Sequence, residues 1–503
     1  MTLHLSRLLT QRAGLTPDRE AYVSGELRLT FDQFAQRTHR LAEYLRENGV
    51  KPGDRVAVCA KNGEFICNAL FATAHLGATL VVLNWRLSSA ELDYALTDSS
   101  PVALLSEAAF STTLSPVVEK HPEWLLVGSG EGALGESYAA IQQTAAAGPV
   151  VWEGPADAPA VIMYTSGTTG RPKGAMLPHA ALINTAISTT ATLDWNCDYR
   201  FLLVAPLFHI GGLSPLICNM LRGCTCVLAA DFDPVGIWDV IQRERINMMM
   251  TVPLMLQAMF QVARSREVDT SSLAWVICGA SMVPPELIEA GAELGIQVQQ
   301  VYGITECCGA LTFWTQPMGL EHLNSHGRPI LNSALKIVDP GTGQTLAAEQ
   351  EGEIWFCGPM VFSGYWGNPD ASEAVLIDGW YRTGDIGRLD SAGFLHVIDR
   401  LKDLIISGGE NIYPAEIEAV LAQLDGVAEV AVIGQPNERF GEIPVAYIAR
   451  AEGSTLDEAA VIQACRDQLA GYKCVKAVEW VTALPRNSVG KVLKRELEGS
   501  RPR

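Results

Sequence analysis

Residues 160–174 read Ala-Val-Ile-Met-Tyr-Thr-Ser-Gly-Thr-Thr-Gly-Arg-Pro-Lys-Gly. The apolar run at 161–164 has the length of a buried strand, and it leads into a loop of hydroxyl and glycine residues. Glycine lets the backbone approach an anion closely, and hydroxyl groups donate hydrogen bonds to phosphate oxygens. Lys173 adds a positive charge after the loop. The stretch therefore predicts a strand followed by a polyphosphate-binding loop, although a polar loop of this kind is also common as an ordinary turn.

The segments around this stretch alternate between helical and strand-like patterns. Helices are expected at residues 31–48 and 180–189, and strands at 55–60 and 78–83. This alternation predicts an α/β fold with a large N-terminal part, in which helices cover parallel-rich sheets. From residue 414 the pattern becomes helix, two strands, helix and strand, which indicates a small α+β domain.

Composition limits the classes of partner. The 503 residues carry a formal net charge of −19, which argues against nucleic acid or an anionic membrane as the main partner. No stretch approaches about 18 uninterrupted apolar residues, so we expect no integral membrane segment. Residues 1–14 lack the apolar core of a signal peptide. The 12 cysteines are scattered and lack zinc-site spacing, which favours reduced thiols in a cytoplasmic protein.

Further motifs place chemically active side chains after apolar runs. His209 follows one such run, and Gly279-Ala280-Ser281 follows another. In Tyr302-Gly303-Ile304-Thr305-Glu306 the ring could stack on a base, and the carboxylate could bind Mg²⁺. Each residue type is also common in a core or on a surface, so none of these motifs identifies a site by itself.

Residues 164–174 resemble the phosphate-binding signature of the AMP-forming adenylating enzymes. This superfamily includes acyl-CoA synthetases, peptide-synthetase adenylation domains and luciferases. The resemblance spans roughly residues 5–497, and the chain resembles bacterial fatty-acid and aryl-acid CoA ligases in particular. The other core motifs occur in the expected order, at residues 206–212, 302–306, 381–385 and 485–491.

The resemblance implies that these motifs bind ATP and Mg²⁺. It places Glu306 on the magnesium ion and Lys491 between the substrate carboxylate and the α-phosphate, and it gives catalytic roles to Thr165, Lys173 and His209 as well. The nucleotide-binding residues that it implies are Thr165, Ser166, Gly167, Thr168, Thr169, Gly170, Lys173, Gly279, Ala280, Ser281, Gln300, Tyr302, Gly303, Thr305, Asp385, Arg400 and Lys491.

The resemblance also implies domain movement. It divides the chain into an adenylating domain at 1–399, a hinge at 400–403 that contains Lys402, and a mobile C-terminal domain at 404–503. Val475 stands where relatives commonly have proline, which is a departure from the family pattern. The residues implied for a tunnel that admits the CoA thiol are Gly408, Gly409, Glu410 and Lys473.

Substrate class rests on the charges near the motifs. No lysine or arginine occurs between Arg266 and Arg328, so a second acidic group on the substrate would find no cation in that span. An apolar fatty chain and an aromatic ring both remain open. The residues expected to line the acyl pocket are His209, Ile210, Gly211, Val301, Cys307, Cys308, Gly309 and Ala310.

The sequence therefore predicts an AMP-forming acid–CoA ligase that uses ATP, Mg²⁺ and CoA. Its partners would be an apolar acid, ATP and CoA, and a homodimer is possible. One alternative is an adenylating enzyme that transfers its acyl group to a carrier protein. A second is a catalytically silent nucleotide-binding protein, but intact Lys173, Glu306, Asp385, Arg400 and Lys491 argue against it.

Overall fold

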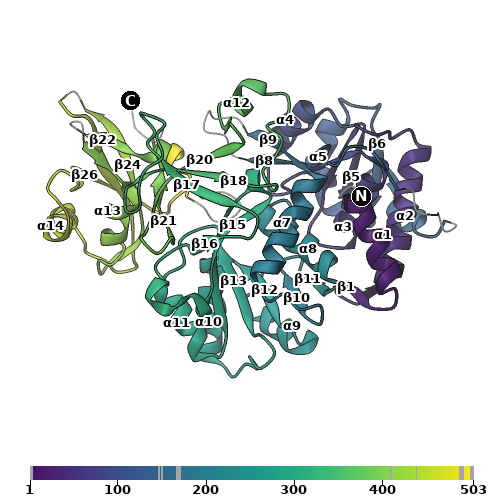
Figure 1. Cartoon of the computed structure of the whole chain (residues 1–503), viewed down its shortest axis with the longest axis horizontal. Coiled ribbons are helices and arrows are strands. Elements are labelled where there is room, and N and C mark those ends of the chain that lie inside the picture. The colour runs from purple at the N-terminus through teal and green to yellow at the C-terminus, as the bar shows by residue number, and fades with distance from the viewer. Residues whose placement is uncertain are drawn as a thin grey trace. The chain divides into compact units, whose positions relative to one another are not determined.

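The chain divides into two compact units, and many of the helices and strands are labelled in Figure 1. The first unit comprises residues 1–335 and 356–381, and the second comprises 336–355 and 382–503. The computed structural model describes residues 4–144, 148, 151–165, 172–407, 410–437, 439–486 and 492–498.

A seven-stranded sheet of the first unit contains the strand before the phosphate-loop sequence. Its order is β7-β6-β5-β3-β4-β8-β9, and all neighbours are parallel except the antiparallel pair β8 and β9. Because β3, β4 and β8 are nearly all buried, they read as continuous apolar runs. The strands are β3 (Arg55–Cys59), β4 (Thr79–Val82), β5 (Ala103–Glu107), β6 (Leu125–Ser129), β7 (Glu136–Ser137), β8 (Pro159–Thr165) and β9 (Lys173–Pro178).

A nine-stranded sheet completes the framework of the first unit. Its order is β16-β15-β14-β13-β12-β10-β11-β1-β2, and the strands from β14 to β1 run parallel. Antiparallel strands occupy both edges of this sheet. The strands are β1 (Glu20–Ser24), β2 (Leu27–Thr30), β10 (Arg200–Leu203), β11 (Thr225–Leu228), β12 (Met248–Thr251), β13 (Trp275–Gly279), β14 (Gln297–Ile304), β15 (Gly309–Trp314) and β16 (Arg328–Pro329).

Helices of the first unit join the two sheets through one buried cluster. Residues of α2, α3, α7 and α8 lie in that cluster together with residues of β3, β8, β10 and β13, and Figure 1 shows α7 beside α8. The helices are α1 (Leu5–Leu15), α2 (Phe31–Glu47), α3 (Glu64–Leu76), α4 (Ser89–Ser99), α5 (Ser111–Val118), α6 (Tyr138–Ile141), α7 (His179–Thr192), α8 (Ile210–Arg222), α9 (Gly236–Glu244), α10 (Pro253–Ser265), α11 (Pro285–Glu293) and α12 (Pro369–Glu373).

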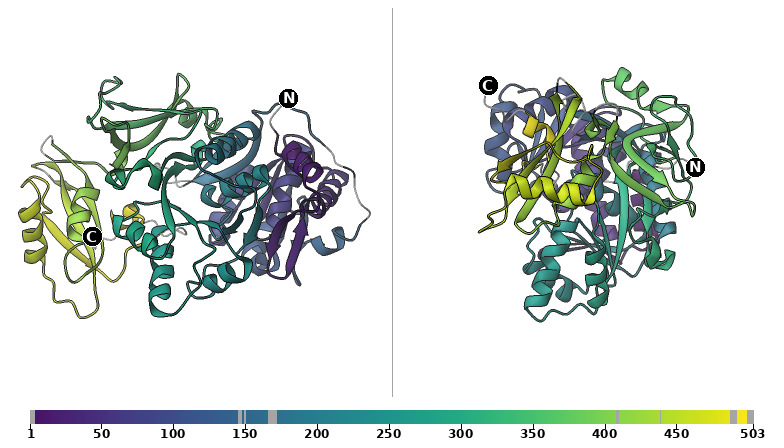
Figure 2. Two further views of the ribbon diagram at one scale, coloured as in Figure 1. Left: turned by 60° about the horizontal axis from the view of Figure 1, so that its bottom comes forward. Right: turned by 90° about the vertical axis from the view of Figure 1, so that its left-hand side faces the viewer.

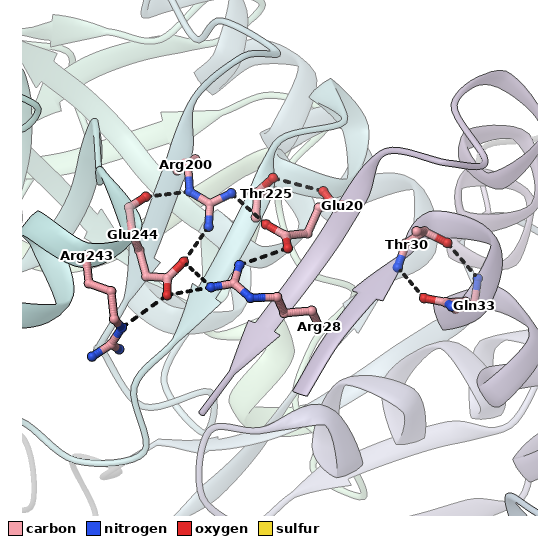
Figure 3. Close-up of polar contacts among 8 residues, drawn as sticks. All are labelled: Glu20, Arg28, Thr30, Gln33, Arg200, Thr225, Arg243 and Glu244. Atoms are coloured by element: carbon pink, nitrogen blue, oxygen red, sulfur yellow. Dashed lines mark hydrogen bonds and ion pairs between the residues drawn. The ribbon is translucent and has the colours of Figure 1, made fainter. Parts of the chain in front are cut away.

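A charge network ties the β1–β2 hairpin to α9 and β10 (Figure 3). The Glu244 carboxylate, 4% exposed, accepts hydrogen bonds from Arg28 at 2.8 and 2.9 Å and from Arg200 at 2.7 Å. Arg28 and Arg200 also donate to Glu20. Burial alone would raise the pKa of Glu244, but hydrogen bonds from Arg28, Arg243 and Arg200 hold it below its usual range. The network keeps a buried carboxylate fully paired.

The second unit has a small sheet with helices on both faces, coloured yellow-green to yellow in Figure 2. Successive side chains of a strand point to opposite faces, so Val432 packs with α13 and α14, whereas Ala431 and Ile433 join the cluster that contains Leu497 of α15. The order is β23-β22-β25-β24, and β26 pairs with β25. The elements are β22 (Ile405–Ser407), β23 (Glu410–Ile412), β24 (Val427–Asn437), β25 (Gly441–Arg450), β26 (Ala477–Val481), α13 (Pro414–Leu421), α14 (Glu458–Gln468) and α15 (Lys494–Glu498).

A fourth sheet contains the strands at which the chain passes from one unit to the other. Its order is β17-β18-β20-β19, and β21 pairs with β20. The divisions after residues 355 and 381 fall inside β18 and β20. The strands are β17 (Ala334–Val338), β18 (Gly352–Cys357), β19 (Leu376–Ile377), β20 (Trp380–Leu389) and β21 (Leu395–Arg400).

The fold class expected from the sequence is confirmed. The first unit has large parallel-rich sheets with helices, and the second has the small α+β sheet that was expected after residue 414. The expected domain boundary at residue 399 and the expected hinge at 400–403 stay predictions. The second compact unit includes residues 336–355 and 382–399 as well. All twelve cysteines are free thiols. Among the described residues, no helix combines the length and apolarity needed to cross a membrane.

Candidate active site

The two ends of the phosphate-loop sequence are held side by side by strand pairing. Thr165 ends β8 and pairs with Lys173, the first residue of antiparallel β9. The structure therefore brings together the hydroxyl and the ammonium group that flank the loop. The loop residues expected to bind phosphate, Ser166, Gly167, Thr168, Thr169 and Gly170, lie outside the described residues.

Glu306 lies beside these two ends. The Thr165 hydroxyl donates to Glu306 Oε1 at 3.5 Å, and the Tyr365 hydroxyl donates to the same oxygen at 2.9 Å. Lys173 Nζ lies over the Tyr365 ring, 5.2 Å from its centroid. Tyr365 is buried, and burial together with the Glu306 carboxylate raises the pKa of its hydroxyl. The phenol therefore stays a hydrogen-bond donor, which orients the carboxylate expected to bind Mg²⁺.

The remaining candidate residues of the first unit lie after strands of the nine-stranded sheet. Parallel strands β10, β12, β13 and β14 end at one edge, and Gly279 at the end of β13 pairs with Val301 in β14. His209 follows β10, Ala280 and Ser281 follow β13, and Glu306 follows β14. Ligands of open α/β sheets commonly bind at the carboxyl ends of the strands. This edge therefore gathers segments that are far apart in the sequence.

Close backbone approach explains two of the candidate glycines. A Cβ on Gly279 would lie 2.4 Å from Val301 Cγ1 and 2.5 Å from the Val301 carbonyl oxygen. A Cβ on Gly303 would lie 2.3 Å from the Gly309 carbonyl oxygen. Ala280 turns the chain with a φ of 70°, and it is exposed together with Ser281. Packing thus requires glycine at positions 279 and 303, whatever the site binds.

Two further residues expected at the nucleotide, Tyr302 and Gln300, have different surroundings. The Tyr302 ring is half-buried and meets the His326 ring edge-on, with centroids 6.2 Å apart. Gln300 is 3% exposed, and its side-chain amide donates to the Leu323 carbonyl. Gln300 therefore already has a protein partner, whereas Tyr302 keeps part of its ring accessible.

His209 is neutral at physiological pH. Burial lowers the pKa of its imidazole to about 4, and the nearby positive charge of Arg86 acts in the same direction. Its Nε2 is buried and has no hydrogen-bond partner in the described part of the chain. A neutral imidazole with an unpaired nitrogen can accept or donate one hydrogen bond to a bound acid without adding charge.

An apolar cavity of about 100 Å³ lies between α7, α8 and the strands of this sheet. Five of the residues expected at the acyl pocket line it: Ile210, Gly211, Val301, Gly309 and Ala310. His209 does not line it, and Cys307 and Cys308 are fully buried in the core instead. None of the described residues that line the cavity is charged.

The candidate residues of the second unit form ion pairs. Arg400 Nε lies 2.5 Å from Asp385 Oδ1, and Lys473 Nζ lies 2.6 and 2.7 Å from the two oxygens of Glu416. Lys402 is exposed in the short 3₁₀ helix Leu401–Asp403. Gly408, Gly409 and Lys491, and the side chain of Glu410, lie outside the described residues. Val475, at the position that departs from the family pattern, is 1% exposed in the core beneath α13 and α14.

Several residues at the site were not expected from the sequence. Tyr365 reaches Glu306 from 59 positions away, and Thr189, Trp195, Met250 and Phe313 line the apolar cavity. Tyr365 stands in Gly364-Tyr365-Trp366, a small aromatic motif, which was its one sequence signal. The cavity residues have the pattern of ordinary core, and only packing brings them together.

Comparison with known proteins settles the family. Residues 9–366 match the AMP-binding enzyme family, and residues 416–491 match the C-terminal domain of AMP-binding enzymes. This chain belongs to the AMP-binding enzyme family. The superfamily resemblance seen in the sequence is therefore confirmed.

The relatives of this AMP-binding enzyme are CoA ligases. It is 38% identical over 495 residues to a feruloyl-CoA synthase from Amycolatopsis, covering 97% of each chain. It is 36% identical over 489 residues to the long-chain-fatty-acid–CoA ligase FadD13 of Mycobacterium tuberculosis, covering 97% of this chain and 96% of that one.

A solved relative shows the same fold with its intermediate bound. The o-succinylbenzoate CoA synthetase of Bacillus subtilis, in complex with its acyl-adenylate, is 33% identical, with a TM-score of 0.89 over 100% of this chain and 99% of that one. The same synthetase has also been solved with ATP and a magnesium ion. The AMP-binding enzyme described here thus shares its fold with an enzyme that forms an acyl-adenylate.

Proposed function

We propose that this protein is an ATP-dependent acid–CoA ligase that activates an apolar carboxylic acid. In the first step the acid carboxylate would attack the α-phosphate of ATP, which gives an acyl-adenylate and diphosphate. In the second step the thiol of CoA would attack the acyl carbon, which gives a thioester and releases AMP. The proposal rests on one observation at the two ends of the loop. Thr165 pairs with Lys173 across β8 and β9, and the Thr165 hydroxyl donates a hydrogen bond to Glu306.

The donor set around Glu306 fits a magnesium ion. Mg²⁺ in nucleotide sites is commonly held by one or two carboxylates, with substrate phosphates and water completing the shell. Glu306 offers one half-buried carboxylate held in place by Tyr365, and the Thr165 hydroxyl lies beside it. The described residues contain no group of three or more His, Cys, Asp or Glu side chains that could hold a metal without substrate. Bound there with ATP, Mg²⁺ would neutralise phosphate charge.

The chain's own residues then have distinct tasks. We assign Tyr302, with Gly279, Ala280 and Ser281, to the adenine, and Asp385 and Arg400 to the ribose. Lys173 and the 166–170 loop would hold the departing diphosphate, and Lys491 would bridge the carboxylate and the α-phosphate. His209 is neutral, and its Nε2 has no hydrogen-bond partner among the described residues. It would therefore donate a hydrogen bond to the acid without adding a charge.

The thioester step is assigned to the second unit. A rotation of the C-terminal domain about Lys402 would move Lys491 away from the reacting groups. The same rotation would bring the residues of the expected thiol tunnel to them: Gly408, Gly409, Glu410 and Lys473. We expect Lys402→Pro to slow thioester formation much more than adenylate formation, because proline restricts the backbone rotation that the exchange requires. Rapid-quench measurement of acyl-AMP and acyl-CoA separates the two steps, and equal slowing of both would remove the hinge assignment.

The proposal includes a cytoplasmic location. This location is supported by the reduced thiols that the sequence predicts, and fractionation of cells that produce the protein tests it.

The proposal also includes a homodimer, which is a common state among enzymes of this size. Light scattering coupled to gel filtration would give a mass near 54.3 kDa for a monomer and about twice that for a dimer.

The deciding experiment measures AMP release with ATP and Mg²⁺, with and without CoA, across fatty and aromatic acids. Turnover that requires CoA with one class of acid is the expected result. Adenylate formation without CoA-dependent turnover would instead favour transfer to a carrier protein. Nucleotide binding without adenylate formation from any acid would favour a silent nucleotide-binding protein.

A further inference from the structure

One residue in the wall of the apolar cavity has a buried hydroxyl group without a partner in the described part of the protein. Thr189 of α7 lines the cavity and is 5% exposed. Its Oγ1 is buried, and it has no hydrogen-bond partner among the described residues. A buried hydroxyl without a partner is unfavourable, so such groups are rare in native structures. Thr189 is therefore the cavity residue that a bound molecule would satisfy.

The other threonines of α7 all have hydrogen-bond partners within the helix. On the same helix the Thr185 hydroxyl donates to the Ala181 carbonyl at 2.9 Å, and the Thr192 hydroxyl donates to the Ser188 carbonyl at 2.7 Å. Such bonds to the preceding turn are the usual solution for a helical threonine. In the cavity wall, the Trp195 indole donates to Asn219 Oδ1 at 3.2 Å.

The size and lining of the cavity limit what could satisfy Thr189. A dry protein cavity of about 150 Å³ lined by apolar side chains is known to hold benzene. At about 100 Å³, with Trp195 and Phe313 in its wall, this cavity matches a small planar group and is far too small for a long alkyl chain. The absence of charge among its described lining residues excludes a second carboxylate.

We propose that the cavity selects aryl acids whose ring carries a hydroxyl group, and that Thr189 recognises this hydroxyl. The inference rests on the proposed acid-activating function, because it takes the cavity as the acid's binding site. A phenolic hydroxyl can donate to or accept from Thr189 Oγ1, whereas an unsubstituted ring or an alkyl chain leaves that oxygen unpaired. Sites that hydrogen-bond a substrate hydroxyl discriminate against the analogue that lacks it.

The test compares acids that differ by one ring hydroxyl. The probes are benzoate and cinnamate, their 3- and 4-hydroxy derivatives, and hexadecanoate. For the unmodified protein, kcat/KM for the best hydroxylated acid should exceed that of its parent by about tenfold, the size of one buried neutral hydrogen bond. Hexadecanoate should be the poorest substrate. A preference for hexadecanoate, or equal values within each pair, would overturn the proposal.

Three variants isolate the hydroxyl. The discrimination ratio is kcat/KM for a hydroxylated acid divided by kcat/KM for its parent acid. Thr189→Val keeps the shape of the side chain and should reduce this ratio to about one. Thr189→Ser keeps the hydroxyl and should retain most of the ratio. Thr190→Val is the matched control, because Thr190 lies on the same helix at 6% exposure but does not line the cavity. An unchanged ratio in Thr189→Val would remove Thr189 from this role.

A binding measurement separates this inference from the proposed function. Isothermal titration of the same acids, without ATP or CoA, should show tighter binding of the hydroxylated member, and Thr189→Val should remove the difference. If no acid supports AMP release but this binding difference is found, the ligase proposal fails and the assignment of the cavity stands. If turnover occurs but neither the binding affinity nor kcat/KM depends on the ring hydroxyl, the assignment of Thr189 and its cavity fails and the ligase proposal stands.

Discussion

Arg400 and Asp385 face each other across antiparallel strands β21 and β20, with Arg400 Nε 2.5 Å from Asp385 Oδ1. Asp385 is 3% exposed, so its carboxylate is buried beside the guanidinium. The two residues that the family pattern assigns to the ribose therefore form an ion pair with each other. A carboxylate accepts hydrogen bonds, so the Asp385 side chain is suited to hold the ribose hydroxyls.

Replacing the carboxylate of this pair should weaken ATP binding. Asp385→Asn keeps the size of the side chain but removes the charge that Arg400 compensates. We expect kcat/KM for ATP to fall by about 10- to 100-fold, since hydrogen bonds to charged groups contribute about 1.5–3 kcal/mol. Steady-state AMP release at varied ATP measures this.

A second ion pair of the same unit provides the control. Glu353 is 2% exposed and pairs with Arg382 at 2.9 Å, but no role in binding is assigned to it. Glu353→Gln should lower stability without a specific effect on the KM for ATP. If both variants change ATP kinetics equally, the ribose assignment of Asp385 is wrong.

Removal of the Tyr365 hydroxyl should alter the dependence on magnesium. In Tyr365→Phe, the Glu306 carboxylate loses the donor at 2.9 Å that holds its orientation. We expect about a tenfold rise in the Mg²⁺ concentration that gives half-maximal activity. Tyr138→Phe removes a similar bond, from a buried tyrosine to Glu64 Oε1 at 2.8 Å, and serves as the control. A normal Mg²⁺ dependence in Tyr365→Phe would show that the bond is merely structural.

Disruption of the Glu244 network should lower stability but spare catalysis. Glu244→Gln leaves Arg28 and Arg200 without their buried anion, so the free energy of unfolding should fall by about 2–4 kcal/mol. Glu349→Gln breaks the more exposed pair with Arg388 and should cost less than about 1 kcal/mol. Urea unfolding followed by fluorescence compares them. Similar losses of unfolding free energy for the two variants would show that burial of Glu244 does not increase its contribution to stability.

Acid should destabilise the first unit through its buried histidines. Burial lowers the pKa of His179 to about 3 and that of His75 to about 4, compared with about 6.5 in an unfolded chain. Below pH 6.5 the unfolded state binds protons that the native state does not, so stability should fall as the pH drops from about 6.5 to about 4. The slope is at most about 1.4 kcal/mol per pH unit for each histidine.

Unfolding free energies measured by urea at pH 7, 6 and 5 test this dependence. His75→Asn removes one of these buried histidines and should flatten the slope over this interval. If the stability is constant between pH 7 and 5, or if the variant keeps the full slope, buried histidines do not control acid stability in this protein.

The helices and strands of the parallel sheets could be predicted because their signals are local. The runs at 55–60 and 78–83 became β3 and β4, and the periodic segment at 31–48 became α2. Strand β9 was missed, because Lys173 and Gly174 belong to the motif and read as the exit of a loop. Its pairing with β8 is a long-range hydrogen-bond pattern that periodicity does not contain.

The sequence by itself determined the family, the order of the motifs and the chemical types of side chain available for ATP and an acid. These follow from residue identity and spacing along the chain. Only the tertiary structure decided that Tyr365 orients Glu306 and that Asp385 pairs with Arg400. It also decided that Thr189 lines an apolar cavity and has no hydrogen-bond partner in the part of the chain that the structure describes. Such contacts depend on packing between distant segments, and packing is a property of the folded chain as a whole.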